Sequence, residues 1–286
     1  MSLESIKTVA VLGAGTMGNG IAHIFARAGI NVILRDVEQR FLDRGLETIG
    51  KNLDREIKKG KLAETEKGTV LGRIQAVTEM NAIAAADFLV EAVPEKIEIK
   101  RAVLSEADRF LRPAAIIASN TSSISMTTLA ALTLRPERFV GMHFMNPVPV
   151  MPLVEVIRAL QTSDATFSAT MELSKKLGKT PVAVNDAPGF VSNRVLMPLI
   201  NEAAYCVMEG VATPEAVDAV MKLGMNHPMG PLELADFIGL DVCVDIMHVL
   251  LEGLGDPKYG ACPLLKKYVA AGWLGRKSGR GFYSYP

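Results

Sequence analysis

The sequence predicts an α/β fold: a doubly wound, mostly parallel sheet that carries a helical insertion, followed by an all-α C-terminal domain. Three observations support this prediction. A glycine-rich turn joins an apolar segment to a helical one near the N-terminus, short apolar segments then alternate with helical ones, and helical periodicity dominates the last third of the chain. We expect an α/β domain over residues 1–187 and a helical domain over residues 188–286.

The composition is that of a folded chain without a strong overall charge. Hydrophobic residues make up 49% and charged residues 22% of the 286 residues, which is typical of globular proteins. The 31 basic residues balance the 31 acidic ones, so we expect no nucleic-acid partner and no membrane partner. The N-terminal segment has neither an apolar signal core nor an Arg-rich transit pattern, and no apolar run is long enough to span a bilayer. We therefore expect a cytoplasmic location.

The three cysteines, Cys206, Cys243 and Cys262, have neither CxxC spacing nor an even count. This argues against a disulfide framework and against a cysteine zinc site. No cluster of histidines, cysteines and carboxylates has metal-ligand spacing either. We therefore expect no metal cofactor and interpret the cysteines as thiols in helix cores.

The first elements form one βαβ unit. An apolar strand is predicted over residues 8–12, followed by a glycine turn and a helix over 17–28 that stops at Gly29. A second strand is predicted over residues 32–34.

The next segment, about residues 38–74, departs from a simple alternation because it is highly charged and strongly helical. We expect two helices there, joined near residues 59–61. Such an insertion is either a solvated decoration or a border for a bulky ligand.

Strands and helices then alternate through the rest of the first domain. This pattern predicts a mostly parallel sheet covered on both faces. Strands are expected over residues 87–93, 115–120, 138–144, 153–158 and 181–186, with helices over 96–111, 125–134 and 164–178.

The pattern changes after residue 186, where Pro188 and Gly189 interrupt the chain and mark the expected domain boundary. Methionines at helical spacing are usually core residues, but short helices of this apolarity also suggest a subunit interface. Four helices are predicted, over residues 191–209, 214–223, 231–253 and 263–271.

The glycine turn has the spacing of a dinucleotide site. Gly13, Gly15 and Gly18 form a GxGxxG motif directly after a predicted strand and directly before a predicted helix. The first glycine permits a tight turn, the second lets the backbone approach a pyrophosphate, and the third lets helix pack on strand. We include Thr16 and Met17, which lie within the motif, in the predicted site.

An acidic residue completes this pattern. Asp36 ends the second predicted strand, where a carboxylate can accept both ribose hydroxyls and would repel a 2′-phosphate. Together the motif and Asp36 predict a Rossmann-type domain that binds NAD. Because Arg35 lies beside Asp36 and could accommodate an extra phosphate, NADP remains the less favoured alternative.

A base for alcohol oxidation is expected in the same domain. His143 ends a predicted strand, at the edge where parallel sheets collect ligands, and histidine commonly takes the hydroxyl proton in such reactions. On its own, a histidine in this position is as often structural as catalytic. Glu155 is a charge within a short apolar strand, where burial is costly without a partner. We therefore expect it to pair with His143, fixing the tautomer and stabilising the imidazolium.

The chain resembles the 3-hydroxyacyl-CoA dehydrogenase family nearly end to end, and in particular its bacterial 3-hydroxybutyryl-CoA members. The motifs that carry this resemblance fall in the family's order and spacing: GAGTMGNGIA, EAVPEKIEIK, ASNTSSIS, GMHFMNPVPVMPLVEVI, APGFVSNR, NHPMGPLELADFIGLD and GWLGRKSGRGFY.

The resemblance implies a role for each of several residues. His143 would be the general base and Glu155 its orienting carboxylate, while Ser122 and Asn193 would contact the oxygens of the substrate. Without the resemblance, Glu95 and Lys100 would be interpreted as solvated helix residues. The cofactor residues that it implies are Asp36, Glu95, Lys100, Ser122, Asn146 and Lys277.

The resemblance also assigns the helical insertion to the CoA moiety, which relatives commonly hold through a serine and a lysine seven apart. The corresponding residues here are Asp54 and Lys61, so an acid replaces the serine. Lys61 is thus the better candidate for a phosphate contact.

The implied activity is reversible NAD-dependent oxidation of a short-chain (S)-3-hydroxyacyl-CoA to the 3-oxoacyl-CoA, by a homodimer that associates through its C-terminal domain. His143 would remove the hydroxyl proton as hydride leaves C3 for the nicotinamide. One alternative is a sister dehydrogenase that acts on a free hydroxy acid or a carnitine-like alcohol. Another is a non-catalytic NAD-binding protein, which would not need a buried His–Glu pair.

Overall fold

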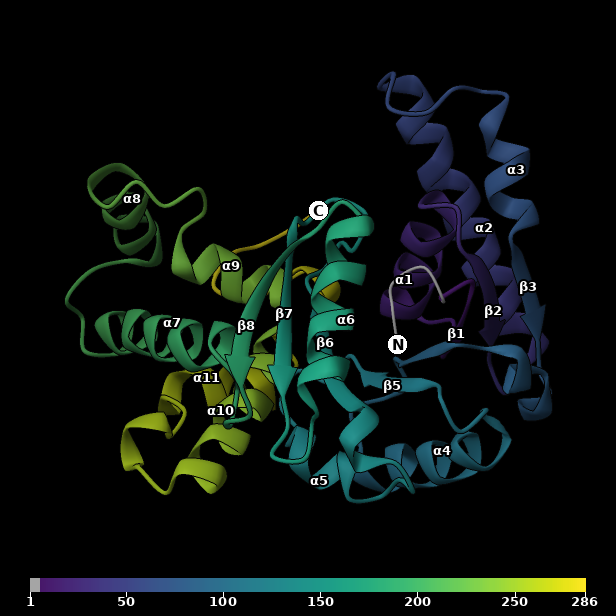
Figure 1. Ribbon diagram of the computed structural model, residues 1–286. Helices are drawn as coiled ribbons and strands as arrows, with labels where there is room; N and C mark the ends of the chain where they lie inside the picture. Colours follow the sequence, from purple (N-terminus) through teal and green to yellow (C-terminus); the bar gives the residue numbers. More distant parts are fainter. Residues whose placement is uncertain (1–5) are drawn as a thin grey trace. The chain divides into compact units, whose positions relative to one another are not determined.

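The computed structural model describes residues 6–286 (Figure 1). The chain divides into two compact units, one that ends at Asp186 and one that runs from Ala187 to Pro286. The first unit is built on a single sheet and the second is helical, so the predicted fold class is confirmed.

The sheet of the first unit has eight strands in the order β3-β2-β1-β4-β5-β6-β7-β8. Strands β1 to β6 all run parallel to one another. Strand β7 runs antiparallel to β6 and parallel to β8. The strands are β1 (Thr8–Leu12), β2 (Asn31–Arg35), β3 (Ile74–Val77), β4 (Phe88–Glu91), β5 (Ile116–Ser119), β6 (Phe139–Phe144), β7 (Leu153–Arg158) and β8 (Thr180–Asn185).

Helices connect these strands on both faces of the sheet. The chain builds outward from β1 to β3 and then returns to add β4 to β6 on the other side of β1, so right-handed crossovers place the two sets of helices on opposite faces. The strand order reverses between β1 and β4, which is where such sheets bind nucleotides. The helices are α1 (Thr16–Arg27), α2 (Gln39–Lys58), α3 (Glu66–Gly72), α4 (Ile97–Phe110), α5 (Met126–Ala130) and α6 (Asp164–Lys176), with a 3₁₀ helix, η2 (Met80–Ala85).

Successive side chains of each strand point to opposite faces of the sheet, so the strands contribute buried residues to both faces. One set of strand residues packs with apolar side chains of α1, α2 and α6, and includes Val90, Ala118, Met142 and Val156. Because successive strand residues point to opposite faces, their neighbours lie on the other face, towards α4 and α5. Four of these neighbours are polar and buried: Glu91, Ser119, His143 and Glu155.

The second unit has its own core, built mainly from α7, α9, α10 and α11, and α8 packs against it through the partly buried Val217. Two buried aspartates hold the end of the chain against it. Asp236 accepts hydrogen bonds from the backbone N–H groups of Phe282 and Tyr283 at 3.0 Å, and Asp218 accepts one from the Tyr283 hydroxyl at 2.7 Å. The helices are α7 (Ser192–Met208), α8 (Pro214–Gly224), α9 (Pro231–Ile238), α10 (Leu240–Leu254) and α11 (Pro263–Ala270).

Two expectations about elements were wrong. The helix expected over residues 231–253 is two helices, because Gly239 adopts φ +108°, a conformation outside the helical region, and serves as the N-cap of α10. Strand β3 was not expected: its first residue, Ile74, was assigned to the end of the helical insertion, and residues 75–77 were assigned to no element. It is a four-residue edge strand that pairs with β2.

Candidate active site

The glycine loop between β1 and α1 is shaped by close backbone contacts. Gly13 has φ +97°, and a Cβ atom there would lie 2.6 Å from the carbonyl oxygen of Ala92, the residue after β4. A Cβ on Gly18 would lie 1.7 Å from the carbonyl oxygen of Gly13. Neither position can hold a larger residue without moving the backbone.

Gly15 is different, because a Cβ added there meets no described protein atom within 4 Å. Packing within the protein therefore does not explain a glycine here, whereas the close approach of a ligand's phosphates does. Thr16 and Met17 form the first turn of α1, where N–H groups attract an anion. The loop thus fits a dinucleotide.

Asp36 follows β2 and is tied to the same loop. Its Oδ2 accepts a hydrogen bond from Ala14 N at 2.6 Å and its Oδ1 accepts one from Val37 N at 2.7 Å. Arg35 points its Nε to the carbonyl oxygen of Thr78, 3.1 Å away beyond β3.

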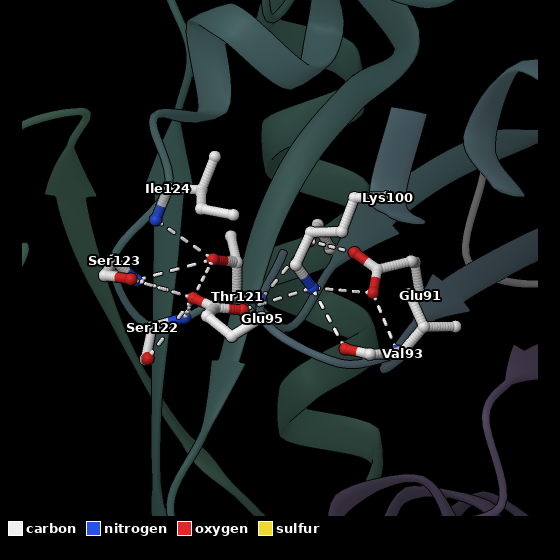
Figure 2. Close-up of polar contacts among 9 residues, drawn as sticks. Glu91, Val93, Glu95, Lys100, Thr121, Ser122, Ser123 and Ile124 are labelled. Carbon is white, nitrogen blue, oxygen red and sulfur yellow. Dashed lines mark hydrogen bonds and ion pairs between the residues drawn. The ribbon is translucent and has the colours of Figure 1, made fainter. Parts of the chain in front are cut away.

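A second group of polar side chains joins the ends of β4 and β5 (Figure 2). The Lys100 ammonium on α4 lies 2.7 Å from Glu91 Oε1 and 3.2 Å from Glu95 Oε2. Glu95 Oε1 accepts hydrogen bonds from the N–H groups of Ser122 at 2.9 Å and Ser123 at 3.1 Å, and one from the Thr121 hydroxyl. The turn that carries Ser122 is therefore organised around one carboxylate.

The charge of Glu95 is favoured by these contacts. Burial opposes ionisation, but Lys100 and the hydrogen bonds from residues 121–123 outweigh it and hold the pKa of Glu95 below its usual value. Glu95 is thus an anion at neutral pH, and the turn is fixed to it by charge-assisted hydrogen bonds.

The expected contact between His143 and Glu155 is present. The two residues face each other across the antiparallel pair β6–β7, and His143 Nδ1 lies 2.8 Å from Glu155 Oε2. His143 is 7% exposed and Glu155 2% exposed. Because register sets the partners of a cross-strand pair, the pairing of β6 with β7 places the Glu155 carboxylate beside the His143 ring.

Neighbouring polar groups hold the strand ends around the pair. Asn120, which follows β5, accepts a hydrogen bond from Phe144 N at 2.9 Å through its Oδ1. The connection from β6 to β7 carries Asn146, an exposed residue. Lys179, at the start of β8, donates to the carbonyl oxygens of Met151 at 2.8 Å and of Val148 and so fastens this connection.

The remaining predicted residues lie elsewhere in the chain. Lys61 is exposed in the turn after α2, and Asp54 on α2 forms an ion pair with Lys67 at 2.6 Å. In the second unit, Asn193 is buried in the first turn of α7, and Lys277 forms an ion pair with Asp241 at 2.6 Å.

Sequence reasoning missed Glu91, which the structure buries completely and joins to Lys100. A signal was available, since Glu91 is a lone charge at the end of an apolar strand, the same feature that drew attention to Glu155.

The described residues show neither a metal-binding cluster nor a membrane-spanning helix. Residues 6–286 contain no group of three or more histidines, cysteines and carboxylates that could hold a metal ion. Within the same range, no helix is both long and apolar enough to cross a membrane.

Comparisons with known proteins cover the whole of both units. A family model described as the NAD binding domain of 3-hydroxyacyl-CoA dehydrogenase matches residues 8–187, and one described as its C-terminal domain matches residues 189–285. A probable 3-hydroxybutyryl-CoA dehydrogenase of Bacillus subtilis is 58% identical over 280 residues, 98% of each chain.

Solved structures agree with this assignment. An (S)-3-hydroxybutyryl-CoA dehydrogenase from Ralstonia eutropha matches with a TM-score of 0.96 and 52% identity, over 99% of this chain and 100% of that one. A diketoreductase of dicarbonyl compounds matches with a TM-score of 0.84 and 30% identity, over 98% of this chain and 99% of that one.

Proposed function

Because the chain belongs to the 3-hydroxyacyl-CoA dehydrogenase family and is an NAD-dependent oxidoreductase, we propose that its substrate is a short-chain (S)-3-hydroxyacyl-CoA such as 3-hydroxybutyryl-CoA. His143 is the general base of this reaction and Glu155 its orienting carboxylate. The observation that carries the proposal is the buried pair that they form, 2.8 Å apart.

The pair accounts for proton transfer. When Nδ1 carries the proton of the neutral ring and donates a hydrogen bond to the Glu155 carboxylate, Nε2 is the basic nitrogen. His143 can then take the hydroxyl proton of the substrate, and Glu155 stabilises the imidazolium that results. The nicotinamide of bound NAD supplies the acceptor for the hydride. In the reverse direction the imidazolium returns the proton to the 3-oxo oxygen.

The cofactor site favours NAD over NADP. Gly13, Gly15 and Gly18 hold the pyrophosphate against the start of α1, and Asp36 accepts the ribose hydroxyls and repels a 2′-phosphate. Arg35, which points to Thr78, does not relieve this repulsion. The other residues proposed around the cofactor are Thr16, Met17, Glu95, Lys100, Ser122, Asn146 and Lys277.

The substrate contacts in this proposal are those that the family resemblance implies. Ser122 and Asn193 contact the oxygens of the acyl chain, and Lys61 contacts a phosphate of CoA. Asp54 lies beside the CoA site, with its charge balanced by Lys67, so that it does not repel those phosphates. The preference for a short acyl chain rests on the names of relatives that are 58% and 56% identical to this chain.

A second candidate is reduction of a ketone that carries no CoA. The likeness to a diketoreductase favours it, because that protein has the same fold at 30% identity. The basic cluster at the end of α2, residues 55–61, weighs against it, since a small free ketone carries no phosphates for such a cluster to bind. A non-catalytic role is disfavoured by the buried contact of His143 with Glu155, because burying a carboxylate costs stability and binding NAD alone does not need one there.

One experiment separates these candidates. The oxidation of NADH is followed with acetoacetyl-CoA, free acetoacetate and the ketone of carnitine in turn, each also with NADPH. We expect acetoacetyl-CoA with NADH to give by far the highest kcat/KM. Equal or faster turnover of a free ketone would contradict the CoA assignment, and no turnover with any of the three would contradict the catalytic role.

We also place the protein in the cytoplasm as a homodimer. The dimer is supported by large apolar side chains that α8 and its surroundings leave exposed, namely Val220, Leu223 and Met225.

A further inference from the structure

Glu91 is a wholly buried carboxylate at the last position of β4, with an exposed fraction of 0%. Burying a charge in this way is costly unless partners compensate for it. The position is notable because β4 lies next to β1, at the point where the strand order reverses, and Ala92 touches the glycine loop at Gly13. A charge here lies beside the dinucleotide site without being exposed to it.

Both carboxylate oxygens of Glu91 are fully engaged. Oε2 accepts a hydrogen bond from the Ser119 hydroxyl at 2.6 Å, which ties the end of β4 to the end of β5. Oε1 accepts one from Val93 N at 2.8 Å and one from the Lys100 ammonium at 2.7 Å. Glu91 therefore fixes the end of its own strand, the neighbouring strand and one lysine of α4.

Lys100 has no capacity left for a ligand in this arrangement. An ammonium has three donors, and three acceptors surround it: Glu91 Oε1 at 2.7 Å, Glu95 Oε2 at 3.2 Å and the Val93 carbonyl oxygen at 3.3 Å. Its exposed fraction is 1%. Lys100 thus acts on the site through Glu95.

Glu95 links Lys100 to the turn at residues 121–123 and so fixes the position of that turn. One of its oxygens faces Lys100 and the other accepts the donors of the turn, so its carboxylate lies between the two (Figure 2). Ser122, the residue of this turn proposed to meet both cofactor and substrate, is thereby connected to Glu91 through two charges of opposite sign.

We propose that Glu91 is a positioning residue of the dinucleotide site, which acts through Lys100 and Glu95 to hold the turn that carries Ser122. Its charge is needed because Glu91 is the closer and wholly buried anion beside Lys100, whereas the second anion, Glu95, is more distant and partly exposed. This inference rests on the dinucleotide site of the proposed function, and it adds a residue that touches neither cofactor nor substrate.

The test is the variant Glu91→Gln, which keeps the shape of the side chain but removes the closer of the two anionic charges beside Lys100. We expect the Kd for NADH, measured by fluorescence titration, to rise about tenfold, which corresponds to about 1.4 kcal/mol. The KM for NAD should rise by a similar factor, while kcat at saturating NAD changes little. A defect confined to stability would leave both the Kd and the KM unchanged.

The matched control is Asp108→Asn. Asp108 is 3% exposed, sits at the other end of α4 and pairs with Arg135 at 2.6 Å. Its change to asparagine likewise removes a buried anion from beside a buried cation, so thermal stability should fall as it does for Glu91→Gln. The affinity for NADH should not change.

A second measurement tests the order of action. In a double-mutant cycle of Glu91→Gln with Lys100→Met, the two effects on NADH affinity should be strongly non-additive, because the residues act as one unit. If Glu91→Gln does not fold, Ser119→Ala replaces it, since this change removes the hydroxyl that donates to Glu91 at 2.6 Å and accepts from Thr121 N at 3.2 Å, and so lies between Glu91 and the turn. It should weaken NADH binding by a smaller factor.

Three outcomes would overturn the inference: wild-type NADH affinity in the Glu91 or Ser119 variant, an equal loss of affinity in Asp108→Asn, or additive effects in the cycle. Failure of the wild-type protein to bind NADH would instead overturn the proposed cofactor site, so the two failures are distinguishable.

Discussion

His143 illustrates how a single residue gains a function from its neighbour. An imidazole alone at a strand end has two tautomers, and only one of them presents a basic Nε2. The Glu155 carboxylate, 2.8 Å from Nδ1, selects that tautomer and favours the charged ring after proton transfer.

Replacement of either member should therefore affect kcat and not cofactor binding. We expect His143→Gln to lower kcat for acetoacetyl-CoA by about 10²–10⁴-fold. The rate is measured by following the oxidation of NADH continuously. Glu155→Gln should cause a loss in the same range, because an amide can also stabilise the wrong tautomer. Undiminished turnover in His143→Gln, with unchanged NADH affinity as the control, would refute the assignment of the base.

His23 on α1 is a second buried histidine, and it should make stability depend on pH. Burial lowers its pKa, an effect strengthened by Arg27 and Lys179 and only partly offset by Glu56, whose Oε1 lies 3.1 Å from Nε2. Below the pH at which a histidine of the unfolded chain gains a proton, about 6.5, the unfolded state therefore binds more protons than the folded one. Stability must then fall as the pH falls.

The measurement is urea unfolding of wild type and His23→Gln at several pH values between about 5.5 and 7.5. The wild-type free energy of unfolding should decline more steeply towards low pH than that of the variant, by at most about 1.4 kcal/mol for each pH unit. Parallel slopes for the two proteins would show that His23 does not titrate in this way.

At the scale of elements, periodicity located most helices and strands but not every interruption. Gly45 lies inside α2 and Gly239 separates α9 from α10, yet both appear in the sequence as single glycines within helical patterns. What distinguishes them is tertiary: Gly45 keeps a helical conformation beside Ala14, whereas Gly239 adopts φ +108°. Strand β3 was missed for a similar reason, since only its pairing with β2 defines it.

The connection between β6 and β7 offers a prediction at this scale. Lys179 holds this connection in place, because it donates hydrogen bonds to the carbonyl oxygens of Val148 and Met151. In Lys179→Met the carbonyl oxygen of Val148, which is buried, and that of Met151, which is partly buried, lose their donor, so we expect a loss of about 1–3 kcal/mol in stability. Hydrogen exchange should become faster in the connection. Lys176→Met, a change at an exposed lysine one turn earlier in the chain, is the control and should alter neither quantity.

At the scale of the whole molecule, the sequence could not assign all site residues by itself. The contact of His143 with Glu155 followed from a charge in an apolar strand, and Asp36 followed from its distance to the glycine motif. Asn193 and Lys277 have no such local pattern, because a site assembled from distant segments leaves no periodic trace in any one of them. Their roles came from the family resemblance and stay predictions.

Association is the prediction that belongs to this scale. Leu223 is 88% exposed and Met225 60% exposed on the second unit. If this surface is the dimer interface, Leu223→Glu combined with Met225→Glu should convert the protein to a monomer in light scattering. The control is Leu160→Glu on the first unit, where the leucine is 87% exposed. An unchanged dimer in the double variant would place the interface elsewhere.

The reversed direction of β7 has a consequence for protein engineering. Strand register, not the segment between the strands, sets the spacing of His143 and Glu155, and a slip of one residue would turn Glu155 to the opposite face. Segments of other lengths can therefore be grafted between β6 and β7 while the proton-transfer pair is retained. New substrate selectivities can be sought by exchanging that segment, because the hydrogen bonds between β6 and β7 keep the distance between the two side chains constant.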